Sequence, residues 1–350
     1  MNRWLQLALA TCLACQALMA HGASETMDAL DGIEKQVEAL FAQGQLAQVA
    51  EIIEDDWRSE TRLVDGRWRE DITRTYAARA MNQRWHSEDE WNEGLRQLKA
   101  VAGQRPSAWL LVASAQHVRA WQLRGHAYAR EVPADAMAAY RQWCLRAVAT
   151  LDEHRAELIS YATWYDDRLN LAMETGESRD FQRKLFVEGL VQFPRYHRLY
   201  FTRTRDLLPK WGGSEGQVLD LLDDIARSTD PRILSEGLYA RVLWFAEGER
   251  LPLQWDPRIN DKALRASIDA LVAAYPAQWN IQRMFLFSCQ RGDKEHARQM
   301  LPLLTDPPEE VMLGANLSVY QNCRQWADGK RTEVVMGYEQ GGLPKIVIVH

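Results

Sequence analysis

Prolines divide this chain into segments that each carry the apolar spacing of an amphipathic helix. Between about residues 27 and 328, Ala, Leu, Arg, Glu and Gln dominate, and few stretches alternate as a strand does. Proline ends one helix and precedes the next, and it stands between the periodic segments at Pro106, Pro194, Pro231, Pro276 and Pro307. The sequence therefore predicts an all-α fold.

The spacing also predicts repeated pairs of antiparallel helices. Successive prolines are mostly about 30–45 residues apart, close to the length of known helix-pair repeats. Residues 279–308 fit a tetratricopeptide-type unit best, with Gly292 at the turn, and Gly44 and Gly176 mark the turns of two weaker copies. We expect a superhelical array of such pairs, which presents an extended concave surface.

The end of the chain has a different pattern. Residues 332–336 and 345–349 are rich in β-branched side chains and flank Gly341 and Gly342, which is typical of two short strands in a hairpin. The hairpin either packs on its own domain or pairs with a partner strand. We therefore expect a helical repeat-like domain over residues 24–330 and a C-terminal β appendage over residues 331–350.

The first residues have the layout of a secretory signal peptide, which we assign to residues 1–23. Arg3 precedes an apolar stretch from Trp4 to Ala20, and the small residues Gly22 and Ala23 follow. No later apolar run approaches the roughly 20 residues of a membrane span. We expect a mature protein in the periplasm or secreted from a bacterium.

Removal of the signal peptide leaves three cysteines, Cys144, Cys289 and Cys323. Their spacing indicates neither a disulfide framework nor a metal site, so we predict no metal and no cofactor. Cys289 and Cys323 lie one tetratricopeptide period apart, at equivalent positions of neighbouring units. Stacked helices are about 8–10 Å apart, whereas a disulfide requires Cα atoms within about 7 Å. The sequence therefore predicts that both thiols stay unpaired.

The charge of the chain argues against nucleic acid as a partner. The 42 basic and 48 acidic residues give a net charge of −6. Nucleic-acid binders normally present a basic face, and no run of Lys and Arg occurs in this sequence.

Ser214 lies in a G-x-S-x-G match that suggests a hydrolase nucleophile. That motif requires a buried strand before the serine, and here charged residues and Pro209 precede it. Gln217 and an amphipathic run follow, which is the pattern of a helix cap. We interpret Ser214 as an N-cap.

Other chemically suggestive residues also have structural interpretations. Three acidic pairs, Asp55-Asp56, Asp166-Asp167 and Asp223-Asp224, point about 100° apart on a helix, so each pair is interpreted as a solvated face or helix end. His117 is interpreted as a buried, hydrogen-bonded imidazole rather than a ligand.

Tryptophans could serve as anchors or as a recognition surface. Five lie within apolar helical faces and are interpreted as core or inter-helix anchors: Trp109, Trp121, Trp143, Trp244 and Trp279. The pairs Trp121 with Arg124, and Lys210 with Trp211, combine an aromatic ring with a cation. We name these four residues as candidate binding residues, with structural roles as the alternative.

Several short motifs within residues 40–227 carry a family resemblance. They are Pro106-Ser-Ala-Trp109 leading into Ala120-Trp-Gln-Leu-Arg-Gly125, then Trp164-Tyr165, and Phe193-Pro-Arg-Tyr196 leading to Leu208-Pro-Lys-Trp-Gly-Gly-Ser214. Together they resemble a bacterial domain of unknown function, family 4034. The resemblance implies a secreted, helical, tetratricopeptide-like protein and assigns no activity.

The function that these observations favour is binding. An array of helix pairs offers an extended surface for a protein or peptide partner. We therefore expect a scaffold of the bacterial envelope, and the sequence leaves open whether it is an enzyme. The alternative is an envelope hydrolase whose active site is assembled from residues distant in sequence.

Overall fold

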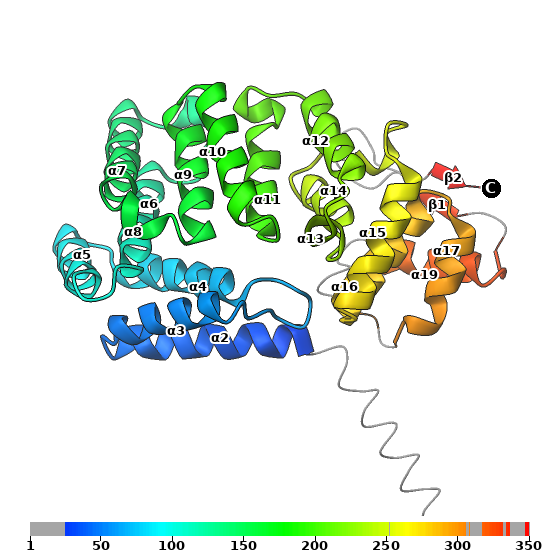
Figure 1. Ribbon diagram of the computed structural model, residues 1–350, viewed down its shortest axis with the longest axis horizontal. Coiled ribbons are helices and arrows are strands. Elements are labelled where there is room, and N and C mark those ends of the chain that lie inside the picture. The colour runs from blue at the N-terminus through cyan, green and yellow to red at the C-terminus, as the bar shows by residue number, and fades with distance from the viewer. Residues whose placement is uncertain are drawn as a thin grey trace, which may run out of the picture. The chain divides into compact units, whose positions relative to one another are not determined.

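The computed structural model describes residues 25–251, 253–305, 308, 317–331, 334–336 and 347–349, the last two segments by their backbone alone. The expected signal peptide, residues 1–23, lies outside this range. Within it, no helix is both long and apolar enough to cross a membrane. The described residues form seventeen α-helices packed largely as sequential pairs, so the predicted all-α architecture is confirmed (Figure 1).

The chain divides into two compact units. The N-terminal unit comprises Leu30–Leu63 and Arg67–Ser214, and the C-terminal unit comprises residues 25–29, Val64–Gly66 and the described residues from Glu215 onward. The sequence pattern treats residues 24–330 as one domain and does not predict this division.

The helices of the N-terminal unit are mostly three to five turns long. They are α2 (Glu25–Ala42, which begins before the unit), α3 (Leu46–Arg58), α4 (Arg69–Arg84), α5 (Glu88–Ala102), α6 (Ala108–Arg124), α7 (Ala134–Glu153), α8 (Arg155–Leu158), α9 (Ala162–Thr175), α10 (Arg179–Gln192) and α11 (His197–Asp206), with the 3₁₀-helices η1 (Ala129–Glu131) and η2 (Pro209–Trp211). The pairs α3 with α4, α5 with α6, and α9 with α10 pack against each other.

The C-terminal unit continues the succession of helices and ends in two strands. Its elements are α12 (Glu215–Arg227), α13 (Pro231–Leu234), α14 (Leu238–Gly248), η3 (Leu253–Trp255), α15 (Asp261–Ala274), α16 (Gln278–Gln290), α17 (Lys294–Met300), η4 (Leu301–Leu303), α19 (Leu317–Ala327), β1 (Val334–Met336) and β2 (Val347–Val349). The strands pair antiparallel, with Val334 opposite Val349. Residues 337–346, which join them, lie outside the described part of the chain, so the hairpin stays a prediction.

Glycines with positive φ form the turns that the repeat pattern predicts. Gly44 (φ 69°) joins α2 to α3, Gly176 (φ 77°) follows α9, and Gly292 (φ 72°) separates α16 from α17. Glycine adopts this backbone conformation without the strain that a Cβ atom causes. The side chains of Ser178 and Asp293 cap the helices that follow two of these turns. The positions of the three turns are confirmed.

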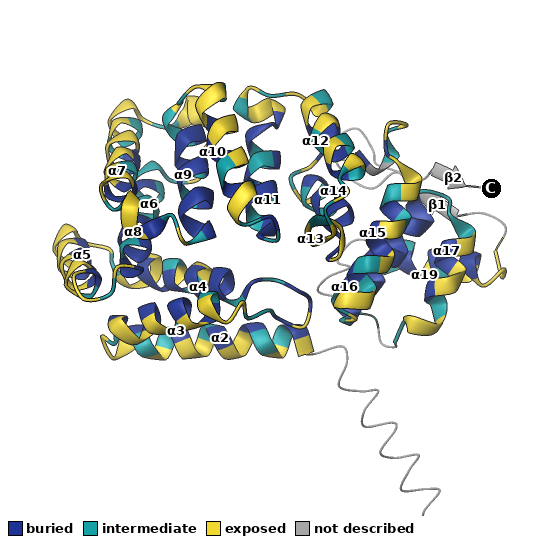
Figure 2. Cartoon of the chain, in the orientation of Figure 1, coloured by how far each residue is buried: buried dark blue, intermediate teal, exposed yellow. Residues whose placement is uncertain are grey.

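The most deeply buried tryptophans are not the predicted anchors. Trp91, Trp164 and Trp326 are at most 2% exposed, and Figure 2 shows the buried residues of the helices in dark blue. The five predicted anchors are only half-buried: Trp109, Trp121, Trp143, Trp244 and Trp279. An indole is large enough to pack one face on a neighbour while an edge stays in solvent.

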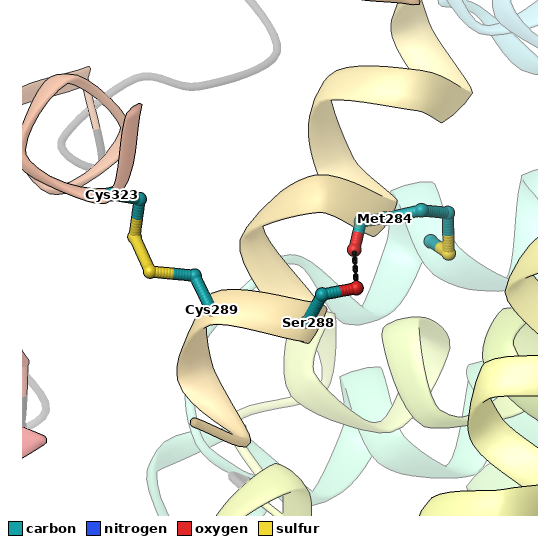
Figure 3. Close-up of a disulfide and its surroundings, with 4 residues drawn as sticks. All are labelled: Met284, Ser288, Cys289 and Cys323. Atoms are coloured by element: carbon teal, nitrogen blue, oxygen red, sulfur yellow. Dashed lines mark hydrogen bonds between the residues drawn. A yellow bond between two sulfur atoms is a disulfide. The ribbon is translucent and has the colours of Figure 1, made fainter. Parts of the chain in front are cut away.

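The prediction that Cys289 and Cys323 stay unpaired is wrong. A disulfide joins them, with Cα atoms 6.0 Å apart, and links α16 to α19 (Figure 3). The helices α16 and α19 pack directly on each other, so the two cysteines face one another instead of pointing the same way. The assumption that they hold equivalent repeat positions fails with the prediction. The disulfide is consistent with an oxidising compartment.

Candidate functional site

A polar pocket of about 250 Å³ lies in the N-terminal unit among α4, α6, α9 and α11. In Figure 1, α9 and α11 stand above α4. The charged and titratable side chains of its lining are Arg74, His117, Asp166, Asp167, Arg198 and Arg205. Helices that are far apart in sequence therefore contribute charged side chains to one small pocket, whose lining also includes apolar residues.

Arg74 joins α4 to α9 at this pocket. Its Nη1 and Nη2 atoms donate to Asp167 Oδ2 and Oδ1 at 2.9 and 3.0 Å. Its Nε lies 3.6 Å from Oε1 of Glu70, which is buried one turn earlier on α4. Because a two-point hydrogen bond constrains both position and orientation, this contact fixes the two helices relative to each other.

Arg198 joins α11 to the same two helices. Its Nε lies 3.2 Å from Asp166 Oδ2 on α9 and 3.3 Å from Asp71 Oδ1 on α4. The hydroxyl of Thr202 donates to the other oxygen of Asp166. Burial raises the pKa of Asp71 although Arg198 opposes the shift. One wall of the pocket is thus held together by charged hydrogen bonds.

The interpretation of the Asp166-Asp167 pair as a solvated face or helix end is wrong, although the two side chains do diverge. They contact different arginines, as their angular separation predicts. Both lie in the middle of α9, and Asp166 is only 1% exposed. The arginines of neighbouring helices make that burial tolerable, because a buried charge requires a partner.

Glu70 is buried behind the pocket wall, and its carboxyl group stays protonated to a higher pH than that of an exposed glutamate. Thr163 Oγ1 donates to its Oε1 at 2.6 Å, and the Tyr196 hydroxyl donates to its Oε2 at 3.2 Å. Burial raises the pKa of Glu70 to about 7, against the opposing charge of Arg74. Its charge therefore changes near neutral pH.

The variant Glu70→Gln should weaken the pH dependence of stability. An unfolded chain releases this proton near the ordinary pKa of 4.5, whereas the folded chain holds it to about 7. Between these values the folded state binds more protons, so wild-type stability falls as pH rises. Urea unfolding at about pH 5 and pH 7.5 measures the slope. Glu153→Gln, on the exposed side of α7, is the control, and a Glu70→Gln slope equal to that of the wild type contradicts the assignment.

His117 borders the pocket and also belongs to a second polar cluster. Its Nε2 lies 2.7 Å from Oε2 of the buried Glu174. The Tyr140 hydroxyl donates to the same oxygen at 2.8 Å, and the Cys144 thiol lies 3.7 Å from it. The imidazole is hydrogen-bonded as predicted, but it is only partly buried.

The electrostatics of this cluster favour an ion pair and a protonated thiol. Burial opposes charge on His117, but Glu174 outweighs burial and raises the pKa of the imidazole. Burial likewise opposes ionisation of Glu174, and the contact with His117 reverses this and lowers the pKa of the carboxyl. Burial and the nearby Glu174 raise the pKa of the Cys144 thiol to about 12. In this environment too small a fraction of the Cys144 thiol is deprotonated for the residue to act as a nucleophile.

A Ser–His–Asp chain of hydrogen bonds lies in the C-terminal unit. Ser288 Oγ is 3.0 Å from His296 Nδ1, and His296 Nε2 is 3.0 Å from Asp269 Oδ1. These are the residue types of a serine hydrolase triad. Ser288, however, is 2% exposed and its hydroxyl donates to the Met284 carbonyl oxygen at 3.2 Å (Figure 3). Because no substrate reaches a hydroxyl buried in this way, the chain links α15, α16 and α17 structurally.

A fluorophosphonate should therefore leave Ser288 unmodified in the folded protein. The variant Ser288→Ala should lower the free energy of unfolding by about 0.5–1.5 kcal/mol, the net worth of an internal hydrogen bond. Peptide mass spectrometry locates any adduct, and a known serine hydrolase treated in parallel verifies the reagent. An adduct on Ser288 would instead support the hydrolase alternative.

Ser214 occupies the position predicted for a helix cap. The helix α12 begins at Glu215, directly after it. The residues before it form α11 and η2 rather than a strand. The local structure of a nucleophile elbow is therefore not formed around this serine.

The four predicted binding residues lie on two elements. Trp121 and Arg124 are in the last turn of α6, where the Arg124 guanidinium carbon is 4.8 Å from the indole ring. Lys210 and Trp211 belong to η2. The indole N–H of Trp121 lies 3.0 Å from His117 Nε2, so the first pair adjoins the pocket lining. Binding at either pair stays a prediction.

Comparisons of the chain with protein-family models, with curated proteins and with solved structures find no match. The resemblance to family 4034 therefore stays a prediction. The geometry of the pocket and of its surroundings is the basis for the functional inference.

Proposed function

We propose that this protein is an envelope scaffold that binds a segment of a protein or peptide in the pocket among α4, α6, α9 and α11. The observation that carries the proposal is the convergence of four helices on one polar space. Helix-pair arrays use their inner helices in this way, because stacking leaves one helix of each pair facing the concave side. The repeat-like, superhelical arrangement is part of the proposal.

The chemistry of the lining favours a polypeptide segment over an apolar ligand. Arg74 and Arg198 present donors, while Asp166 and Asp167 present acceptors. Their mutual contacts hold them in place before a ligand arrives, which reduces the entropy lost on binding. A peptide backbone offers complementary donors and acceptors at short spacing.

We extend the proposed binding surface along α6 from the pocket to Trp121 and Arg124. Trp121 contacts His117 of the lining, and an indole with a guanidinium beside it suits aromatic or acidic side chains. Lys210 and Trp211 form a second proposed contact. The proposed location is the periplasm or the exterior of a bacterium, with the disulfide between Cys289 and Cys323 as support.

Filling the pocket tests this proposal. Ser114→Trp places an indole among the lining residues, because Ser114 lies on the pocket wall of α6. Leu145→Trp adds the same group at a position on α7 that is 57% exposed. Affinity capture from bacterial envelope extract should recover a partner with the wild type and Leu145→Trp but not with Ser114→Trp. Equal recovery with all three proteins would contradict binding in the pocket.

The hydrolase alternative has less support. Its best residues, Ser288, His296 and Asp269, form a hydrogen-bonded chain, but Ser288 contacts Nδ1 and Asp269 contacts Nε2, the reverse of the serine hydrolase triad. The burial of Ser288 leaves no room for a substrate carbonyl. Binding is therefore the function that we favour.

A further inference from the structure

Three potential metal ligands from three helices meet beside the pocket of the N-terminal unit. His117 of α6, Cys144 of α7 and Glu174 of α9 each offer one ligand atom, and these atoms lie within 4.8 Å of one another. Cys144 is fully buried and Glu174 nearly so, whereas His117 reaches the pocket. Nitrogen, sulfur and oxygen donors of these types form the usual ligand set of zinc.

The hydrogen bonds in this cluster compete for the same atoms. His117 Nε2 lies 2.7 Å from Glu174 Oε2 and 3.0 Å from the indole nitrogen of Trp121. If Nε2 donates its proton to Glu174 it cannot accept from Trp121, and if it accepts it has no proton for the carboxylate. The Tyr140 hydroxyl adds a second donor at the same Oε2. Nε2 therefore cannot satisfy Glu174 and Trp121 at the same time.

Asn170 adds a buried oxygen without a partner. Its Nδ2 donates to Glu174 Oε1 at 3.3 Å, which sets the orientation of the amide. Its Oδ1 is buried and makes no hydrogen bond, although the residue lines the pocket. Such an atom in a folded protein commonly indicates a bound water or ion, and an amide oxygen also suits a metal-bound water.

We propose that His117, Cys144 and Glu174 bind a zinc ion through Nε2, Sγ and Oε2, with a fourth position open toward the pocket. Zinc–ligand bonds of about 2.0–2.3 Å in a tetrahedral site place ligand atoms roughly 3.2–3.6 Å apart. The Nε2–Oε2 distance of 2.7 Å would lengthen and the Sγ–Oε2 distance of 3.7 Å would shorten slightly. The ligand atoms span up to 4.8 Å, so the remaining Nε2–Sγ distance is the longest and would shorten by about 1.2 Å, which side-chain rotation must supply.

Metal binding at this site releases two protons and requires no oxidant or reductant. The ion takes the Nε2 lone pair and replaces the proton between His117 and Glu174, while the Cys144 thiol loses its proton to become a thiolate. Both protons leave to solvent through the pocket that His117 lines. A water or a carboxylate of a bound segment completes the coordination. The inference concerns metal binding and holds whether or not the pocket takes a polypeptide.

Titration of the full-length protein with Co²⁺ tests the proposal. We expect one Co²⁺ per chain and a thiolate-to-cobalt absorption band in the near ultraviolet, since Co²⁺ occupies zinc sites with the same ligands. Added Zn²⁺ should displace Co²⁺ and remove the band. Tryptophan fluorescence should change in parallel, because Trp121 contacts His117.

Variants of the ligands identify the site. Cys144→Ser should abolish the band, and His117→Gln should weaken binding by at least about tenfold. His86→Gln, which removes an exposed histidine, is the matched control and should change nothing. Melting curves show which variants fold. Wild-type protein that binds no Co²⁺ or shows no thiolate band would overturn the proposal, and so would a band that survives Cys144→Ser.

Discussion

Replacement of Arg74 by methionine should lower the free energy of unfolding by about 3–5 kcal/mol, the cost of leaving buried charges without their partner. The guanidinium donates two hydrogen bonds to Asp167 and lies 3.6 Å from Glu70. Methionine fills much of the volume but offers neither carboxyl group a cation. Because the pKa of Glu70 is already about 7, this residue can take up a proton below neutral pH. The loss should therefore be larger at about pH 8 than at pH 6.

Arg79→Met provides the control for this experiment. Arg79 lies on the same helix and forms an ion pair with Glu34, but the guanidinium is half exposed. Such surface pairs contribute about 0–1 kcal/mol. Urea unfolding followed by circular dichroism compares the two variants. Similar losses in both would contradict the importance of the buried ion pairs behind the pocket.

Removal of the disulfide should destabilise the protein by about 2–5 kcal/mol. Cys289 and Cys323 close a loop of 34 residues in sequence, and the bridge restricts the unfolded chain over that length. The double variant Cys289→Ala/Cys323→Ala should therefore unfold at lower urea concentration than the wild type. Its urea midpoint should also be insensitive to a thiol reductant.

Cys144→Ala is the control for the redox response. Cys144 is the free cysteine among the described residues and is buried. Its removal should leave the sensitivity of the wild type to reductant intact, whatever the change in baseline stability. A wild-type midpoint that does not move when reductant is added would contradict a stabilising disulfide.

The order of helices and turns could be predicted because the signals are local. Gly44, Gly176 and Gly292 each stand where a backbone with positive φ ends one helix and starts the next. Pro106, Pro194 and Pro276 lie between helices and Pro231 begins α13, for reasons equally confined to neighbouring residues, whereas Pro307 lies outside the described residues.

The pairing of Cys289 with Cys323 could not be predicted from spacing. A separation of one repeat length suggested equivalent positions, yet the relevant quantity is the direction of each side chain on α16 and α19. That direction depends on how the two helices rotate against each other, which tertiary packing decides.

The charged pocket was missed for a similar reason. Asp167 and Arg74 are 93 residues apart in sequence. No local sequence pattern therefore indicates the contact that stabilises the aspartate in the folded protein. One signal was available: Asp166-Asp-Arg168 interrupts the apolar residues in the middle of α9. Charges inside an otherwise apolar helix indicate partners on other helices. The His117 cluster lacked even this signal, because its three ligands come from three helices.

A photo-reactive amino acid at Ser114 tests most directly whether the pocket binds a polypeptide. Ser114 lines the pocket, whereas Leu145 on α7 is exposed and serves as the second labelling position. After irradiation in bacterial envelope extract, mass spectrometry identifies the cross-linked peptides. Binding in the pocket predicts adducts at Ser114 that map to one segment of one partner and are absent at Leu145. No adduct at Ser114, or the same adducts at both positions, would contradict it.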